Sequence, residues 1–268
     1  MRVAPGGGAS LTMIDSRAIV HPDARIAYDV SIGPFSIVGP KVEIGEGTRI
    51  GAHVVIDGRT RIGRGNDIHH YASIGGPPQD KKYGGEETAL EIGDGNTIRE
   101  YVTINTGTVQ DAGVTRLGDD NWIMAYVHIA HDCQIGSHVV LANLVQLAGH
   151  VVLDDWAYLG GGVLVHQFVH VGAHSFLGMQ SALASDVPPY VTISGSPPRP
   201  FGINREGLRR RGFTAESIQA IKRAYRTLYR SGLSLEDATR ELATQAQSHA
   251  EIRVLADFLA RARRGILR

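Results

Sequence analysis

A six-residue stretch in the middle of the chain combines side chains that can transfer protons or bind metals. The segment HIAHDC runs from His128 to Cys133 and contains two histidines, one carboxylate and the only cysteine of the chain. Imidazole exchanges protons near neutral pH, and histidine, cysteine and carboxylate are all zinc ligands. The stretch therefore indicates acid–base chemistry, a metal site, or polar residues on a repeat, and its spacing alone does not choose among them.

A repeat with a period of six predicts the elements that hold these side chains. An aliphatic residue occupies every sixth position in three phased runs, Val20 to Ile74, Ile92 to Ile104 and Leu117 to Leu183, which make 25 hexads. The fifth residue of a hexad is usually small or β-branched, and glycine, which tolerates a tight corner, often follows the aliphatic residue. A period of six suits short strands joined by tight turns, because neither a helix nor a long strand has that period.

Three hexads in each turn predict a triangular parallel β-helix, in which residues 18 apart stack about 4.8 Å from one another. The general crossover rule favours a right-handed path. We expect the β-helix to span 13–196, after a flexible glycine-rich tail at 1–12. Residues 80–91 and 110–116 lack an aliphatic residue in phase, and we expect them to be loops that leave the coil.

The remainder, 197–268, predicts a small α-helical domain. Thr214 is a candidate N-cap for a helix that ends at Ser231 and Gly232. Ser234 and Asp237 resemble a capping box for a second helix, and apolar residues from 252 to 262 mark a third.

Composition narrows the classes of function. Lysine plus arginine and aspartate plus glutamate both total 27, so the chain has no basic excess for binding nucleic acid or an anionic membrane. No apolar run is long enough to span a bilayer, and no signal peptide is evident at the N-terminus. With a single cysteine, these features predict a cytoplasmic protein without disulfides and without stable membrane insertion.

The 18-residue columns give HIAHDC a geometry. His131, Gly149 and Gln167 fall in one column, and Asp132 lies below His150. His131 can act as a general base that Asp132 orients, while the backbone N–H of Gly149 can donate to a developing oxyanion.

A metal is the second interpretation of the same cluster. Zinc needs at least three ligands, and a two-residue gap on a strand sends side chains in different directions. A metal site is therefore possible only across subunits. Cys133 is the fifth residue of its hexad, so we expect it to be buried rather than nucleophilic.

Several motifs together resemble one family. HIAHDC, LAGHV, VHQF, QDKKY, DVPPYV and the stretch 201–213 are similar to the UDP-N-acetylglucosamine O-acyltransferases that begin lipid A biosynthesis, and the resemblance covers 13–268. It implies a left-handed β-helix, a homotrimer and no metal or other cofactor. It also implies transfer of a 3-hydroxyacyl chain from acyl carrier protein to the 3-hydroxyl of UDP-N-acetylglucosamine.

The resemblance also implies roles for individual residues. The base falls on His131 and the oxyanion donor on Gly149. Sugar and acyl contacts fall on Asp80, Lys82, His128, His150 and Gln167. Nucleotide contacts fall on Asn204, Glu206, Arg210 and Arg211. The residue that limits acyl length falls on Met179, which predicts a chain of roughly ten to twelve carbons.

A locally basic cluster begins the helical domain of this neutral chain. Acyl carrier proteins are acidic, so we expect the cluster to dock the carrier. It comprises Arg209, Arg210, Arg211, Lys222, Arg223 and Arg226.

Two other classes of function remain as alternatives. A γ-class carbonic anhydrase has the same repeat with a three-histidine zinc site, so bound zinc would distinguish it. A non-catalytic scaffold would lose only stability when His131 is replaced.

Overall fold

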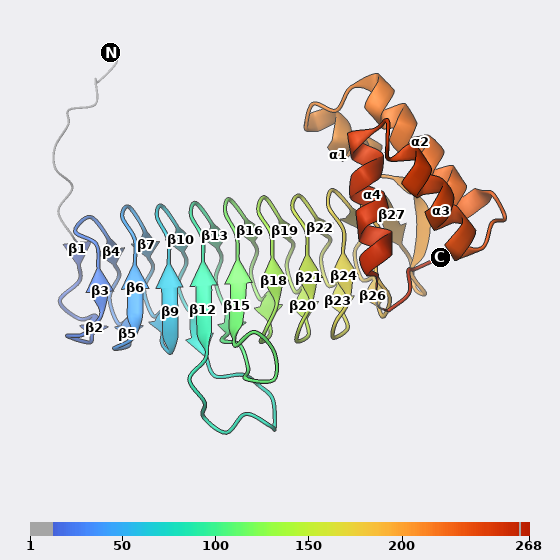
Figure 1. Cartoon of the computed structure of the whole chain (residues 1–268). Helices are drawn as coiled ribbons and strands as arrows, with labels where there is room; N and C mark the ends of the chain where they lie inside the picture. Colours follow the sequence, from blue (N-terminus) through green and yellow to red (C-terminus); the bar gives the residue numbers. More distant parts are fainter. Residues whose placement is uncertain (1–12, 263) are drawn as a thin grey trace, which may run out of the picture.

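The computed structural model describes residues 13–262 and 264–268. The flexible tail predicted for 1–12 lies outside the described residues. The chain forms a left-handed parallel β-helix, and a small group of helices packs at its C-terminal end (Figure 1). This is the predicted fold class.

Three sheets, here named A, B and C in chain order, form the sides of the β-helix. All their strand pairs are parallel except β27 with β28. Sheet A contains β1 (Met13–Ile14), β4 (Ser31–Ile32), β7 (Arg49–Ile50), β10 (Asp67–Ile68), β13 (Thr97–Ile98), β16 (Trp122–Ile123), β19 (Val140–Leu141), β22 (Tyr158–Leu159), β25 (Phe176–Leu177), β27 (Val191–Ser194) and β28 (Arg199–Ile203). Sheet B contains β2 (Ile19–Val20), β5 (Ile37–Val38), β8 (Val55–Ile56), β11 (Ser73–Gly76), β14 (Thr103–Asn105), β17 (His128–Ile129), β20 (Gln146–Leu147), β23 (Leu164–Val165) and β26 (Ala182–Leu183). Sheet C contains β3 (Arg25–Ile26), β6 (Val42–Ile44), β9 (Arg59–Ile62), β12 (Ala89–Ile92), β15 (Val114–Leu117), β18 (Gln134–Ile135), β21 (Val152–Leu153) and β24 (His170–Val171).

The hexad residues make the core of the β-helix. The aliphatic residue of each hexad points inward, and those from Ile32 to Leu183 are at most 4 % exposed. The fifth residue of the hexad packs beside it, and Val127 and Val145, for example, are 0 % exposed. Strand partners are 18 residues apart where no loop intervenes, for example His128 and Gln146, so the predicted stacking of columns is confirmed.

Glycine after the aliphatic residue has a different cause from the one we predicted. At Gly33, an added Cβ would lie 2.7 Å from the backbone of Gly51 in the next coil, so close approach between coils requires glycine. The left-handed backbone conformation falls two residues later in the corner and is often adopted by larger residues, such as Phe35 (φ 61°) and Asp132 (φ 59°).

Two excursions leave the coil between sheets B and C, and they hang below the β-helix in Figure 1. They occupy 77–88, between β11 and β12, and 106–113, between β14 and β15. The predicted bounds of 80–91 and 110–116 were therefore wrong at their ends. The sequence 89–92 forms a four-residue strand whose Leu90 is a second inward residue at 0 % exposure. A pattern with one aliphatic residue in each hexad could not show it.

Four helices follow the β-helix: α1 (Arg205–Arg210), α2 (Ala215–Arg230), α3 (Leu235–Gln245) and α4 (Ala250–Arg261). The side chain of Thr214 accepts a hydrogen bond from the Ser217 N–H, and Ser234 accepts one from Asp237, so both predicted N-caps are confirmed. Residues 199–203, at the start of the predicted helical region, form β28 instead. Short α1 was not predicted. Tyr225 of α2 joins the core of the β-helix, so the helices close its end.

Candidate active site

A pocket of about 670 Å³ lies where sheet B turns into sheet C, in the middle of the β-helix. We call this edge the B–C corner; it includes residues 130–133, 148–151 and 166–169. The two excursions flank it. The pocket is lined by Gln79, Asp80, Lys81, Lys82, Gln110, Asp111, His131, His150, Gln167 and Phe168. The structure therefore brings five of the predicted site residues together, Asp80, Lys82, His131, His150 and Gln167.

His131 and Asp132 form a buried pair in this corner. The His131 Nδ1 lies 2.8 Å from the Asp132 Oδ2, and the Asp132 side chain is fully buried. The left-handed backbone at Asp132, which aspartate tolerates well, turns the carboxylate back toward the preceding imidazole. When the carboxylate accepts a hydrogen bond from the Nδ1–H, the other ring nitrogen, Nε2, carries no proton and can accept one.

The excursion 106–113 fixes the Asp132 carboxylate. Thr108 donates its backbone N–H to Oδ1 at 2.9 Å and its hydroxyl to Oδ2 at 2.6 Å. The backbone N–H of Asp132 donates to the Thr115 hydroxyl at 2.8 Å. Neither threonine was predicted, because the repeat gives no information about residues of an excursion or about hydroxyls that point into the corner.

Gly149 lies directly above the His131 ring. A Cβ at this position would be 2.5 Å from the His131 Cε1 and 2.6 Å from Nε2, so only glycine leaves room for the imidazole. No residue in the described part of the chain accepts a hydrogen bond from the Gly149 N–H. The predicted column is confirmed.

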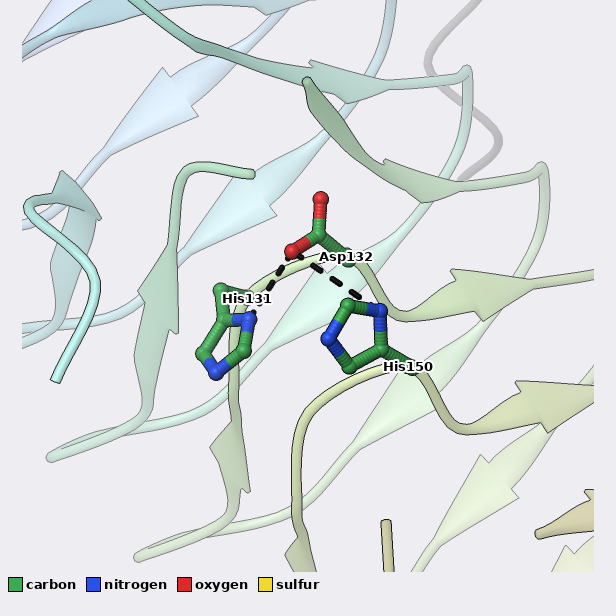
Figure 2. A group of neighbouring side chains, drawn as sticks. All are labelled: His131, Asp132 and His150. Atoms are coloured by element: carbon green, nitrogen blue, oxygen red, sulfur yellow. Dashed lines mark hydrogen bonds and ion pairs between the residues drawn. The ribbon is translucent and has the colours of Figure 1, made fainter. Parts of the chain in front are cut away.

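His150 completes the cluster, and Figure 2 shows its ring beside that of His131. The two rings meet edge to face with centroids 5.1 Å apart, while Phe168 stacks on His150 at 4.3 Å. The His150 Nδ1 lies 2.8 Å from Asp111 and 3.9 Å from the Asp132 Oδ2. Asp111 belongs to an excursion, and it too was missed.

A second groove, of about 470 Å³ and mostly apolar, crosses the outer face of sheet B. His128 lies in this groove rather than in the first pocket, and its Nδ1 is 2.7 Å from the Thr103 hydroxyl. Burial, together with the charge of His131, lowers the pKa of His128. The groove is lined by His128, Gln146, Leu147, Ala148, Leu164, Val165, His166, Ala182, Leu183 and Ala184.

The predicted nucleotide residues lie elsewhere in the chain, near the corner where sheet C turns into sheet A (the C–A corner). Asn204 caps α1 and donates to the backbone carbonyl of His174 at 3.0 Å. Glu206 pairs with both Arg209 and Arg210 at 2.9 Å, and the hydrogen bond from Arg209 lowers the pKa of Glu206 to about 2. One chain therefore does not place these residues beside His131.

Arg211 is held more firmly than its neighbours. Its guanidinium lies 5.0 Å from the centre of the Trp156 ring, and its Nη1 is 3.2 Å from the His174 Nδ1. Burial and the Arg211 charge lower the pKa of His174 to about 4, which keeps the imidazole neutral and able to accept this hydrogen bond.

The remaining predicted residues are distributed over the surface. Met179 is 74 % exposed where sheet A turns into sheet B, so it does not fill the core. Lys222, Arg223 and Arg226 lie exposed on α2. No helix of the described residues is long and apolar enough to cross a membrane.

The structure also bears on two other interpretations, a metal site formed by the histidine cluster and a nucleophilic Cys133. Ligand atoms of His131, Asp132 and His150 lie within 4.8 Å of one another. Both Nδ1 atoms and both Asp132 oxygens, however, already take part in the hydrogen bonds described above. Cys133 is buried as predicted, and burial raises the pKa of its thiol to about 12.

Comparison with known proteins gives one consistent result. A family model described as UDP N-acetylglucosamine O-acyltransferase, domain 2, matches 186–267, and one for bacterial transferase hexapeptides matches 23–58 and 115–149. The chain is 57 % identical over 258 residues to the acyl-(acyl-carrier-protein)–UDP-N-acetylglucosamine O-acyltransferase of Thiobacillus denitrificans, covering 96 % of this chain and 100 % of the relative. The likewise named protein of Paraburkholderia phymatum is 57 % identical, with the same coverage. The solved UDP-N-acetylglucosamine acyltransferase of Francisella novicida is 46 % identical with a TM-score of 0.94, covering 96 % of this chain and 94 % of that one.

Proposed function

The chain belongs to the UDP-N-acetylglucosamine O-acyltransferase family, and from that premise we propose that the pocket around His131 is where it transfers its acyl chain. The enzyme moves a 3-hydroxyacyl chain from acyl carrier protein to the 3-hydroxyl of UDP-N-acetylglucosamine, the first step of lipid A biosynthesis. The interpretations as a carbonic-anhydrase-like enzyme or a scaffold are not supported. We place the reaction in the cytoplasm.

The observation that supports this site is the pairing of a carboxylate-held imidazole with a free amide. The Nε2 of His131 takes the proton of the sugar hydroxyl, whose oxygen attacks the carbonyl carbon of the acyl thioester. The Gly149 N–H donates to the oxyanion that forms. The tetrahedral intermediate then expels the carrier thiolate, which takes the proton back from the imidazolium.

A turnover assay tests the function. UDP-N-acetylglucosamine and a series of 3-hydroxyacyl carrier proteins are supplied, and the acylated sugar nucleotide is detected by mass spectrometry. The assay should give an ester of the 3-hydroxyl and free carrier thiol in equal amounts. Coenzyme A thioesters of the same chains test whether the carrier protein itself is required.

We further propose a homotrimer, on the basis of an exposed aromatic column. Rings stack along the A–B corner with centroids 4.8 to 5.1 Å apart. They belong to Phe35, His53, Tyr71, Tyr101 and Tyr126. The outer face of sheet C instead holds exposed ion pairs, such as Arg25 with Glu43 at 2.8 Å. An exposed aromatic column favours contact between subunits, whereas a charged ladder favours water.

The trimer completes the site. If three A–B corners meet at a threefold axis, sheet B of one protomer faces sheet A of the next. The B–C corner with His131 then lies beside the C–A corner of the partner, near the partner's Arg211. Arginine binds a diphosphate well because its donors match the phosphate oxygens. This arrangement reunites residues that one chain keeps apart.

Met179 is the proposed limit of acyl length. The apolar groove of sheet B begins beside His128 and extends over Leu164 and Ala182, whose strands start from the corner that carries Met179. An acyl chain of roughly ten to twelve carbons would fill this path before meeting the Met179 side chain.

Met179→Gly should move the preferred donor toward longer chains, because each methylene that gains contact is worth about 0.8 kcal/mol, a few-fold in kcat/KM. The measurement is kcat/KM across a series of donor lengths. Asn143→Gly, two coils below in the same exposed column, is the control and should keep the profile of the unmodified enzyme. An unchanged profile in Met179→Gly would show that another residue sets the length.

The basic cluster at the start of the helical region is the proposed dock for the acidic carrier. Reversing charge at Lys222 and Arg223 should raise the KM for the acyl carrier protein about three- to tenfold, most strongly at low salt, with the KM for UDP-N-acetylglucosamine unchanged. Reversing charge at Arg240 and Arg253, exposed on α3 and α4, changes the net charge equally and is the control. Equal increases of both KM values would refute the dock.

A further inference from the structure

Each of the two facing imidazoles has a carboxylate of its own. The Nδ1 of His131 is 2.8 Å from Asp132, and the Nδ1 of His150 is 2.8 Å from Asp111. Asp132 is buried at the corner, whereas the Asp111 side chain is 51 % exposed on the excursion 106–113. The His150 side chain is only 13 % exposed, so Asp111 reaches in from the rim to a nearly buried ring.

Without Asp111, the nearest carboxylate to the His150 Nδ1 is the one that His131 uses. The Asp132 Oδ2 lies 3.9 Å from the His150 Nδ1, a separation that a small rotation of the ring could close (Figure 2). This oxygen already accepts from His131 at 2.8 Å and from the Thr108 hydroxyl at 2.6 Å. A third donor would weaken the bond that orients His131.

We propose that Asp111 is a positioning residue of this acyltransferase. It accepts a hydrogen bond from the His150 Nδ1–H, which keeps the His150 Nε2 available to the substrate and lets Asp132 bind His131 alone of the two rings. This inference rests on the proposed function. Phe168 stacks on the His150 ring at 4.3 Å and fixes its plane, so the carboxylate decides the rotation and the tautomer within that plane.

The excursion delivers Asp111 with little freedom. Thr108, three residues earlier, is tied to Asp132 by two hydrogen bonds, and the backbone N–H of Asp111 donates to the Thr108 carbonyl at 3.3 Å. One short segment therefore holds the carboxylates of both histidines in place. We expect the segment to couple the two rings, so that a change at Asp111 acts through His150.

The test compares three variants in the full-length enzyme. Asp111→Asn keeps the shape but offers an amide, and it should lower kcat/KM for UDP-N-acetylglucosamine about tenfold, as expected when a charge-assisted hydrogen bond is lost. Asp111→Glu restores the carboxylate and should recover activity to within about threefold. In a His150→Gln background, Asp111→Asn should have almost no further effect on kcat/KM, because the histidine through which Asp111 acts is already absent.

Several outcomes would overturn the proposal. Activity of Asp111→Asn equal to that of the unmodified enzyme is one such outcome. Another is a loss that repeats in full in the His150→Gln background, which would mean that Asp111 acts elsewhere. Loss in Asp111→Glu equal to that in Asp111→Asn would point to loop structure alone. Glu43→Gln, which alters an exposed pair with Arg25 at 2.8 Å on the outer face of sheet C, is the matched control. If the unmodified enzyme itself forms no acylated product, the proposed function fails instead.

Discussion

Replacing His131 with alanine should lower kcat by about 10²- to 10⁴-fold, with the affinity for UDP-N-acetylglucosamine largely kept. The proposed base is well prepared: the His131 imidazole is held at 2.8 Å by a buried carboxylate, which itself accepts two further hydrogen bonds. The imidazole contributes little to ground-state binding, so the loss should fall on kcat rather than on KM.

Steady-state kinetics with both substrates varied, and a direct binding measurement for the nucleotide sugar, check this expectation. His21→Ala is the matched control, because His21 lies at the B–C corner in the first coil, far along the β-helix from the pocket. Circular dichroism of both variants tests whether the fold is kept. Turnover in His131→Ala close to that of the unmodified enzyme would sink the assignment of the base.

The coil itself could be predicted from sequence because each hexad repeats the same physical requirement. An inward aliphatic residue and a small fifth residue recur without a slip over long runs, so errors cannot accumulate within a run. The excursions are another matter. Leu90 is as buried as any hexad residue, yet it falls outside the phase, and the start of β12 was misplaced for that reason.

The site was predictable to the extent that it follows the coil. The contact between His131 and Gly149 is a direct result of the 18-residue column, and a Cβ at 149 would collide with the ring. Thr108 and Asp111 come from an excursion, where no repeat fixes position, so sequence could not connect them to the histidines. The separation of Arg211 from His131 also depends on which corner each occupies.

That separation leads to an expectation for mixed trimers. The variants His131→Ala and Arg211→Ala should each be nearly inactive alone. In Arg211→Ala the activity should fall about 10²-fold, because a partly buried guanidinium no longer binds the diphosphate. Trimers assembled from equal amounts of the two should recover activity. In the proposed trimer, a site needs an intact His131 from one protomer and an intact Arg211 from the next, and random assembly supplies both at about one quarter of the interfaces.

Co-expression with two affinity tags, followed by sequential purification, isolates the mixed trimers for assay. The control mixes His131→Ala with Asp132→Asn: these residues lie on the same corner of one chain, so no interface in any mixed trimer has both intact, and activity should stay low. Recovery only in the first mixture requires the site to be shared between protomers, since activity within one chain gives the same low value for both. If the first mixture is as inactive as its parents, Arg211 does not serve the neighbouring His131, and the trimer arrangement proposed from the aromatic column is wrong.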